Sequence, residues 1–416
     1  MKPKSTLLFF IVGLSFFWMS CGTSKKSTAP VISGSANVPV KRDSLVVAKD
    51  TTPTTIPSIH KLTIALVLPL QIDAHFKNDT NPDGSPLILP EALQALNFLE
   101  GAKLAQADLK NDLVNIEFKI IDTGFDSLST VKTLQTESLK GVDAVISLLS
   151  PNFNNASATC SDRLKKPFYF FYGSNTQILE NHPWLRLASP SNNTQIRQTA
   201  IFMAEKYPAS NFIIVSREQR RENDIAALFA SVIDSIRGKS SGTVINYKSD
   251  GWSLLKSKLL KNKRNLIIIP TSDESFLSSI LNKISEVKTD YSFMLCGMPG
   301  WETFNSIDPR LMKELDAVFF NGMYADISSP SVNAFRKKFI SEFHADPMIQ
   351  AYMAYDQISF IAAQEFRTGG KKLAYSNFLY HSNGSEQLTP VCDACGFERK
   401  SVNIIKFDDY KFVLLK

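Results

Sequence analysis

The feature that most constrains the fold is a repeated order of short apolar runs and longer amphipathic segments between residues 61 and 320. Apolar runs such as 62–69 and 142–149 are typical of strands that are buried on both faces of a sheet. The segments between the runs carry apolar residues at spacings of three and four, which predict helices with one buried stripe. Strands and helices that alternate in this way form parallel sheets with right-handed crossovers. The sequence therefore predicts an α/β protein.

The expected elements fall into two similar halves. In the first half we expect strands at 62–69, 115–122, 142–149 and 168–171, a helix that Pro90 opens, and a helix at 131–139. In the second half we expect a helix capped by Asn193, helices at 225–236 and 276–287, and strands at 212–215, 243–247, 266–269, 291–295 and 317–320. Helices at 331–344 and 349–367 and a β-like tail follow. The body after residue 60 is too long for one ordinary core and suits two domains.

Residues 1–21 resemble a bacterial lipoprotein signal peptide. Lys2 and Lys4 precede an apolar run from Leu7 to Met19, which suits an export signal and is too short to span a bilayer. The run ends at Cys21, and the bulky residues before this cysteine resemble the looser lipobox of Bacteroidetes lipoproteins. We expect cleavage before Cys21 and its modification with fatty acids such as palmitate. An ordinary cleaved signal with a chance cysteine is the alternative.

Residues 22–60 differ in composition from the body that follows. Ser, Thr, Pro, Val and Lys dominate this stretch, and it contains no aromatic residue. Such a segment cannot bury enough apolar surface to offset the entropy that ordering costs. We therefore expect a disordered tether between the lipid anchor and the body.

The charge of the body argues against nucleic-acid binding. The whole chain has 46 basic and 40 acidic residues; seven basic and two acidic residues precede residue 61, which leaves 39 against 38. A body that is almost neutral offers no basic face to phosphates. The excess positive charge lies in the signal and the tether, where it suits attraction to anionic lipid headgroups.

The order of segments resembles that of the type I periplasmic binding proteins, and among them the leucine/isoleucine/valine-binding branch. The matching segments are Ile64–Leu70, Leu99–Ala102, Ile120–Thr123, Gly141–Ile146 followed by Ser150-Pro151, Lys166–Phe168, Phe320–Tyr324, Phe335 with Phe339, and Ala351–Asp356. The resemblance covers about residues 61–416. It implies two Rossmann-like lobes with parallel sheets, joined by a three-crossover hinge, and a ligand held in the cleft between the lobes. Mapped here, lobe one is 61–190 plus 325–375, and lobe two is 191–324 plus 376–416.

Candidate ligand contacts follow the expected strands, because ligands of open α/β sheets bind beyond the carboxyl ends of the strands. The candidates are Gln71, Ser150, Asn152, Tyr172, Ser174 and Asn175 in lobe one, and Arg217, Trp301 and Tyr324 in lobe two. Ser150 leads, since the corresponding loop of the family holds a ligand carboxylate. The alternatives are a plain helix cap for Ser150, turn roles for the residues after 168–171, a solvated charge run for Arg217, and lobe packing for Trp301.

Amino-acid binders of this family pair the ligand ammonium with acidic groups in the cleft. The substitutes in this sequence are Glu218, Glu302 and Asp326. All three follow expected strands of the second half, and specificity for amino acids stays open at this point.

The cysteines and histidines carry no pattern of an active or metal site. We expect Cys160 and Cys296 to be buried thiols, and Cys392 and Cys395 to form a short disulfide or, alternatively, to be free. The HExxH, GxSxG, P-loop and GxGxxG patterns are missing from the sequence. The sequence therefore predicts a protein that is not an enzyme and holds no metal or cofactor.

Two functions fit these observations. The first is a solute-binding lipoprotein of the periplasm, anchored to the cell membrane or outer membrane of a Gram-negative bacterium. It would capture an amino acid or a similar small polar ligand for an ABC-type transporter permease or a sensor. The second is an interaction lipoprotein that regulates cell-wall synthesis, similar to the activators of penicillin-binding proteins, and needs no small ligand.

Overall fold

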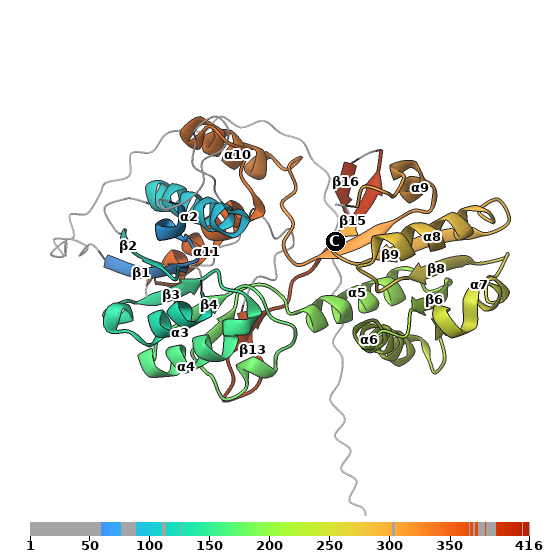
Figure 1. Cartoon of the computed structure of the whole chain (residues 1–416), viewed down its shortest axis with the longest axis horizontal. Coiled ribbons are helices and arrows are strands. Elements are labelled where there is room, and N and C mark those ends of the chain that lie inside the picture. The colour runs from blue at the N-terminus through green and yellow to red at the C-terminus, as the bar shows by residue number, and fades with distance from the viewer. Residues whose placement is uncertain are drawn as a thin grey trace, which may run out of the picture. The chain divides into compact units, whose positions relative to one another are not determined.

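The computed structural model describes residues 60–75, 89–109, 114–124, 126–301, 304–365, 367–368, 371–372, 379, 388–409 and 411–415 (Figure 1). The expected signal peptide, Cys21, nearly all of the expected tether and Glu302 lie outside this part of the chain. Within it, every helix is too short or too polar to cross a bilayer.

The first sheet has seven strands in the order β13-β14-β5-β4-β3-β1-β2. Its members are β1 (His60–Leu68), β2 (Val114–Asp122), β3 (Ala144–Ser147), β4 (Phe168–Phe170), β5 (Leu185–Leu187), β13 (Leu388–Pro390) and β14 (Phe397–Arg399). β1 pairs in parallel with both β2 and β3, and β4 and β5 extend the parallel sheet. The four strands expected in the first half are confirmed. The three-residue strand β5 was not expected.

Helices cover both faces of the first sheet (Figure 1). They are α2 (Pro90–Leu109), α10 (Pro330–Phe343) and α11 (Ile349–Glu365) on one face, and α3 (Ser127–Gln135) and α4 (Asn154–Leu164) on the other. Ile64 and Leu66 of β1 enter the core of the first face, and Ala65 and Val67 enter the core of the second. Because successive strand side chains point to opposite faces, the continuous apolar run supplies both cores.

Helix α2 and helix α11 approach each other closely at Gly101. A Cβ atom at this position would lie 2.1 Å from the carbonyl oxygen of Ala351, so a larger residue cannot be placed without moving a backbone. This close contact holds α11, which comes from the last part of the chain, against α2 on the first sheet.

The second sheet repeats the strand order of the first, in the order β16-β15-β10-β9-β8-β6-β7. Its members are β6 (Asn211–Ser216), β7 (Gly242–Asn246), β8 (Arg264–Ile268), β9 (Ser292–Gly297), β10 (Val318–Asn321), β15 (Asn403–Asp408) and β16 (Lys411–Leu414). The five strands from β6 to β10 are parallel. In each sheet the first strand lies between the second and the third, as in a doubly wound fold.

The second sheet is also covered by helices on both faces. They are α5 (Asn192–Lys206) and α6 (Arg220–Arg237) on one face, and α7 (Tyr247–Ser257) and α8 (Glu274–Ser285) on the other, with the short α9 (Pro309–Glu314) near β15. Helices α7 and α9 were not expected. Asn193 was expected to cap α5, but Ser191 does so, because its hydroxyl accepts a hydrogen bond from the backbone N–H of Thr194.

The tail corrects the expected lobe boundary. Residues 376–416 were assigned to lobe two, yet β13 and β14 belong to the first sheet, where Phe397 pairs in parallel with Arg186 of β5. Only β15 and β16 join the second sheet, and β15 runs antiparallel to β10. Burial explains the placement, since Glu398 and Arg399 are both buried and a carboxylate oxygen of Glu398 accepts the backbone N–H of Ser191.

The chain passes between the two sheets three times. The passages follow β5, β10 and β14 and lie near residues 188–191, 322–329 and 400–402. The architecture is therefore two lobes joined by three crossovers. Smaller elements are α1 (Ile72–His75), the 3₁₀ turns η1 (Glu137–Leu139), η2 (Pro151–Phe153) and η3 (Gln177–Leu179), and the pair β11 (Arg367–Thr368) and β12 (Lys371–Lys372).

Candidate functional site

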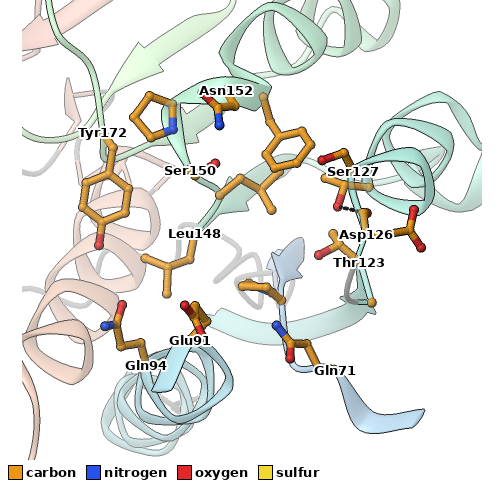
Figure 2. A pocket seen from close by; sticks show the side chains of 16 residues that line it. Gln71, Glu91, Gln94, Thr123, Asp126, Ser127, Leu148, Ser150, Asn152 and Tyr172 are labelled. Carbon is orange, nitrogen blue, oxygen red and sulfur yellow. Dashed lines mark hydrogen bonds between the residues drawn. The ribbon is translucent and has the colours of Figure 1, made fainter. Parts of the chain in front are cut away.

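A cavity of about 440 Å³ lies at the carboxyl ends of the first four strands (Figure 2). It is lined by Gln71 after β1, Thr123 after β2, Ser150 and Asn152 after β3, and Tyr172 after β4. β1 lies between β2 and β3, so the cavity sits at the point where the strand order reverses. This is the place where open α/β sheets bind their ligands.

The carboxylate of Asp122 holds the two loops that follow β1 and β2. It accepts hydrogen bonds from the backbone N–H groups of Gln71 at 3.0 Å, Ile72 at 2.9 Å and Gly124 at 2.9 Å. Gln71 adopts a left-handed backbone with φ of 54°, an uncommon conformation for a residue with a side chain. The three bonds keep the two loops in fixed positions next to the cavity.

Two buried polar groups at this cavity have no hydrogen-bond partner within the described part of the chain. Gln71 is 7% exposed and its Oε1 is unpaired, and Thr123 is 1% exposed and its Oγ1 is unpaired. The backbone of Thr123 is satisfied, since its N–H donates to Leu68 and its carbonyl accepts from the hydroxyl of Ser129. A buried oxygen without a donor costs about 1–3 kcal/mol, so both groups gain from any ligand that supplies donors.

The charged residues that line the cavity are both acidic. Glu91 lies in the first turn of α2, and Asp126 precedes α3. A hydrogen bond from the backbone N–H of Ser129, at 2.8 Å, lowers the pKa of Asp126 below its ordinary value, so this carboxylate is ionised at neutral pH. No lysine or arginine is among the described residues that line this cavity.

Ser150, Asn152 and Tyr172 line the cavity beside the loops after β3 and β4. Ser150 is the N-cap residue of η2, which is the helix-cap position considered from the sequence, but its side chain makes no capping hydrogen bond within the described residues. The side-chain amide of Asn154 donates to the carbonyl of Tyr172 at 2.9 Å and joins the two loops. Burial raises the pKa of Tyr172, and a side-chain hydrogen bond with Gln350 partly offsets this, so the phenol stays protonated.

Two further candidates in lobe one lie outside this cavity. Ser174 lines a different cavity, of about 870 Å³, mainly with residues of lobe two such as Asn193 and Asp224. The side chain of Asn175 accepts the backbone N–H of Gln177 at 2.9 Å, which is the turn role considered from the sequence.

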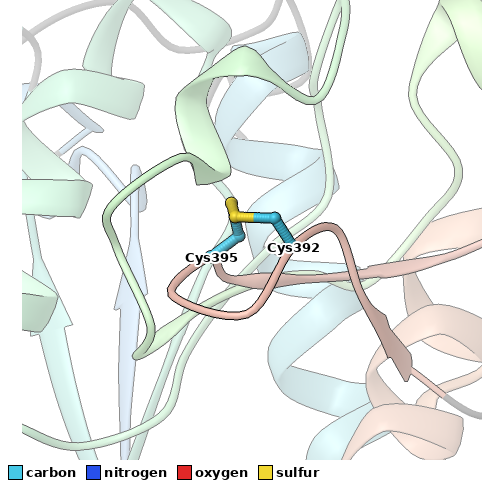
Figure 3. Close-up of a disulfide and its surroundings, with 2 residues drawn as sticks. All are labelled: Cys392 and Cys395. Carbon is cyan, nitrogen blue, oxygen red and sulfur yellow. A yellow bond between two sulfur atoms is a disulfide. The ribbon is translucent and has the colours of Figure 1, made fainter. Parts of the chain in front are cut away.

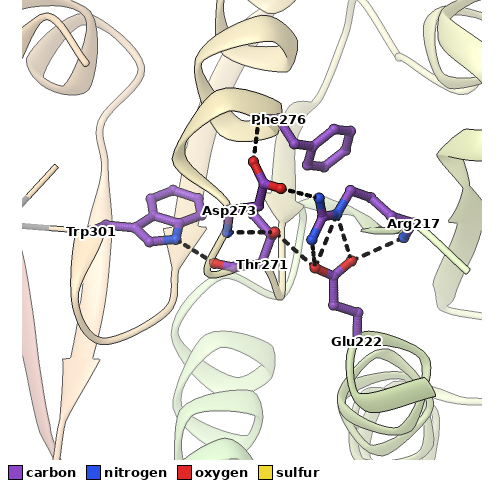
Figure 4. Close-up of polar contacts among 6 residues, drawn as sticks. All are labelled: Arg217, Glu222, Thr271, Asp273, Phe276 and Trp301. Atoms are coloured by element: carbon purple, nitrogen blue, oxygen red, sulfur yellow. Dashed lines mark hydrogen bonds and ion pairs between the residues drawn. The ribbon is translucent and has the colours of Figure 1, made fainter. Parts of the chain in front are cut away.

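Arg217 belongs to a buried network in lobe two (Figure 4). Its guanidinium donates to both carboxylate oxygens of Glu222, at 2.6 to 3.1 Å, and to Asp273 at 2.7 Å. The hydroxyl of Thr271 donates to the same Glu222 carboxylate at 2.8 Å. Hydrogen bonding to Glu222 raises the pKa of Arg217. Arg217 is therefore neither a solvated charge nor a free ligand contact, because two carboxylates already occupy its donors.

Trp301 and Tyr324 also face the interior of lobe two. Trp301 is 1% exposed, its ring covers Gly297, and its indole N–H donates to the carbonyl of Thr271 at 2.9 Å. The hydroxyl of Tyr324 donates to the carbonyl of Phe412, and burial raises its pKa to about 12. Neither residue lines the cavities of about 440 and 870 Å³. Trp301 has the lobe-packing role that was its alternative interpretation.

The acidic substitutes proposed from sequence are also engaged elsewhere. Glu218 lies 3.5 Å from the ammonium group of Lys248, and Asp326 accepts hydrogen bonds from the backbone and hydroxyl of Ser328. The acidic residues at the cavity are instead Glu91 and Asp126, which sequence reasoning missed. Asp126 follows the expected strand at 115–122, so the tendency of ligands to bind beyond strand ends could have identified it. Glu91 lies at the start of helix α2, and its place beside the cavity depends on how that helix packs.

Cys392 and Cys395 form a disulfide in the turn between β13 and β14 (Figure 3). Cys160 and Cys296 are free and buried, and burial raises the pKa of both thiols, that of Cys296 to about 12. Across the described ranges, His, Cys, Asp and Glu side chains form no group that could hold a metal ion. The described cysteines therefore offer no reactive thiolate.

Comparison by sequence finds no match among protein-family models or curated proteins. Comparison by structure finds many similar folds. An ABC transporter substrate-binding protein from Desulfitobacterium hafniense in complex with Leu has 14% identity and a TM-score of 0.54, over 86% of this chain and 100% of that one. A branched-chain amino acid ABC transporter periplasmic ligand-binding protein from Burkholderia xenovorans has 12% identity and a TM-score of 0.56, over 85% and 94%. 

The C-domain of LpoA from Haemophilus influenzae, a regulator of PBP1A, is also similar, with 12% identity and a TM-score of 0.53 over 85% of this chain and 100% of that domain. These similarities show that the chain has the two-lobed type I periplasmic binding protein fold, as the order of its segments predicts. The structural relatives named here are binding and regulatory proteins.

Proposed function

We propose that this chain is a solute-binding lipoprotein of the periplasm that holds an amino acid or a similar small polar ligand in the lobe-one cavity. The observation that carries the proposal is the pair of buried, unpaired oxygens of Gln71 and Thr123 in a cavity at the strand-order reversal. Folded proteins rarely leave such groups unpaired, and a ligand with hydrogen-bond donors would satisfy them. The volume of about 440 Å³ suits a small molecule.

Ligand binding at this site combines fixed and movable parts. The loops held by Asp122 keep Gln71 in place, and the hydroxyl of Ser150, which makes no capping bond within the described residues, adds a donor and acceptor beside the start of η2. Closure of lobe two over the cavity would remove water and strengthen these polar contacts. The three crossovers between the sheets are the connections that such a movement would bend.

The expected membrane anchor completes the proposal. A lipidated Cys21 and the tether of residues 22–60 would hold the body near a membrane while leaving it free to meet a transporter permease or a sensor. Metabolic labelling with a palmitate analogue tests this step, and a Cys21→Ser variant should remain unlabelled.

A thermal-shift screen of amino acids and small organic acids tests the ligand-binding proposal. A true ligand at 100 times its dissociation constant should add about 2.7 kcal/mol of stability. A Ser150→Ala variant should lose affinity about tenfold while melting normally without ligand, and Ser257→Ala, an exposed serine on α7, serves as the matched control. A complete screen without any shift would contradict the proposal.

One observation favours a second candidate function, the regulation of cell-wall synthesis. Arg217 of lobe two is fully engaged by Glu222 and Asp273, so at this strand end lobe two presents no free charge to a solute. A two-lobed regulator such as the LpoA domain has a similar fold. Failure of the solute screen together with specific binding to a purified penicillin-binding protein would select this function.

A further inference from the structure

Basic side chains of lobe two gather at one end of its sheet. We propose that the turns leading into β6, β7 and β8 form a surface that docks on a membrane of anionic phospholipids. This surface lies at the amino ends of these parallel strands, away from the carboxyl ends considered for solute binding. It is called the basic end and carries six exposed lysines: Lys206, Lys239, Lys256, Lys258, Lys261 and Lys263.

The first argument is the excess of positive charge in the three turns. Residues 205–210, 237–241 and 256–264 contain eight basic residues and one acidic residue, Glu205. Within the described part of the chain, none of the six lysines forms an ion pair with a carboxylate. The near neutrality of the body as a whole therefore does not extend to the basic end.

Hydrogen bonds join the three turns into one surface. β6 lies between β7 and β8 in the sheet. At the start of β6, the side-chain amide of Asn211 donates to the carbonyl of Lys258 at 2.8 Å. On the other side, the guanidinium of Arg237 donates to the carbonyls of Tyr207 at 3.1 Å and Ser210 at 3.3 Å. The lysines of the basic end therefore surround one continuous face.

The second argument is that leucine side chains stand among these lysines. Leu254 of α7 is 36% exposed, and Leu260 in the turn before β8 is 39% exposed. The backbone of Leu260 is held by Asn265, which is fully buried: its side chain accepts the N–H of Leu260 at 2.9 Å and donates to its carbonyl at 3.0 Å. The turn therefore keeps an apolar side chain in water, and the interfacial region of a bilayer would bury it.

Lobe one lacks such a surface at the corresponding strand ends. Lys61, Lys140 and Lys166 lie at the amino ends of β1, β3 and β4, and each of them pairs with an acidic residue of the same lobe. The two lobes share one strand order, so the free lysines are a property of the sequence of lobe two and not of the fold.

An anionic lipid surface fits both features of the basic end. Each lysine close to such a surface is attracted by it, over a range set by the Debye length. A nucleic acid would attract the lysines as well, but it would give the exposed leucines no apolar region to enter. The expected lipid on Cys21 would bring the body to a membrane, because the expected tether of residues 22–60 can span about 130 Å when extended.

Binding to lipid vesicles tests the proposal. The mature chain expected from cleavage before Cys21 would carry Cys21→Ser, so that no lipid anchors it. It should sediment with vesicles of phosphatidylethanolamine and phosphatidylglycerol and not with vesicles of phosphatidylcholine, and added salt should release it. Equal binding to both kinds of vesicle, or binding to neither, would overturn the proposal.

A matched pair of variants locates the binding surface. The quadruple variant Lys256→Gln, Lys258→Gln, Lys261→Gln and Lys263→Gln should bind the anionic vesicles at least about tenfold more weakly. The control removes the same charge from lobe one, with glutamine at four exposed lysines that have no ion pair within the described residues: Lys103, Lys119, Lys132 and Lys337. The control should bind as the unmodified chain does, and an equal loss in both variants would overturn the assignment to the basic end.

A last variant separates a lipid surface from other polyanions. Leu254→Ser with Leu260→Ser keeps every charge and should still weaken vesicle binding by about threefold or more, because the leucines no longer enter the interface. Unchanged vesicle binding of this variant, together with tighter binding of the unmodified chain to a DNA duplex than to the vesicles, would overturn the choice of lipid. Melting temperatures equal to that of the unmodified chain show that each variant is folded.

Discussion

The polar groups at the strand ends of the two lobes differ in how they are paired. In lobe one, Gln71 and Thr123 keep buried oxygens without partners within the described residues. In lobe two, Arg217, Glu222 and Thr271 satisfy one another beyond the ends of β6, the counterpart of β1, and β8, the counterpart of β3. The two sheets share one strand order, so topology alone does not cause the difference.

This comparison suggests how one fold can use the carboxyl ends of its strands either for stability or, as proposed for lobe one, for binding. A closed network lowers the free energy of its own lobe and has little left to offer a ligand. An open set of acceptors costs stability and is retained where a ligand completes it. On this view lobe one carries ligand contacts at its strand ends, while the polar residues that lobe two offers, such as Asn193 and Asp224, lie in the neighbouring cavity of about 870 Å³.

The largest effect is expected at Trp301. Trp301→Ala should lower the free energy of unfolding by about 3–5 kcal/mol, because it empties a core position over Gly297 and leaves the carbonyl of Thr271 without its donor. Urea denaturation of the purified protein measures this. Trp252→Ala, a partly buried tryptophan of α7, should cost less. Normal stability with lost ligand affinity would instead place Trp301 in the binding site.

The next effect tests the closed network. Glu222→Gln should lower the free energy of unfolding by about 3 kcal/mol, since it leaves the mostly buried guanidinium of Arg217 with one carboxylate instead of two. Glu218→Gln is the control, because the pair of Glu218 with Lys248 is exposed and should contribute about 0.5 kcal/mol or less. Equal losses in the two variants would mean that the network of lobe two is no more stabilising than a surface pair.

One substitution made in both lobes sharpens the comparison further. Thr271→Val should lower the free energy of unfolding by about 1–3 kcal/mol, because the carboxylate of Glu222 and the backbone N–H of Asp273 each lose a hydrogen bond. Thr123→Val should leave ligand-free stability unchanged or raise it, because the hydroxyl it removes is buried and unpaired. Denaturation curves without ligand compare the two. A similar loss in Thr123→Val would show that this hydroxyl has a partner in solution.

The sequence predicted the residues of the lobe-one cavity better than the hydrogen-bonded network of Arg217, Glu222 and Thr271 in lobe two. Gln71, Ser150, Asn152 and Tyr172 meet in one cavity because parallel strands bring their carboxyl ends to the same edge, and each residue closely follows an apolar run. This rule needs only the order of strands. Thr123 obeys the same rule, because it directly follows β2, although it was not among the expected ligand contacts.

Contacts between residues far apart in the sequence explain why Arg217 and Trp301 were wrongly expected to face a ligand. The charge run that begins at Arg217 looks solvated, and nothing local shows that Asp273, 56 residues away, completes its pairing. Trp301 follows a strand, but Gly297 leaves room for the ring to fold back into the core. The assignment of residues 376–416 to lobe two was wrong for a similar reason. β14 is only three residues long, and it pairs with β5, which is far away in the sequence, where Glu398 is buried.

The smallest effect concerns two aspartates that cap helices in the two lobes. Asp126 caps α3 and Asp273 caps α8, and backbone hydrogen bonds, from Ser129 and Phe276, lower the pKa of each. The pKa of Asp273 is lowered further by Arg217. A carboxyl whose pKa is lower in the folded state contributes stability that is present above its unfolded pKa and is lost as the pH falls through the folded pKa.

Stability measured between pH 2 and pH 6 should therefore separate the two caps. Asp273→Asn should reduce stability more than Asp126→Asn at pH 6, since asparagine still caps a helix but cannot pair with Arg217. Both differences from the unmodified protein should shrink below the ordinary aspartate pKa of 3.8. If the Asp273→Asn difference stayed constant down to pH 2, ionisation of Asp273 would not be the source of its effect. Equal effects of the two variants at pH 6 would mean that the ion pair with Arg217 adds no stability to the cap of α8 beyond that of the cap of α3.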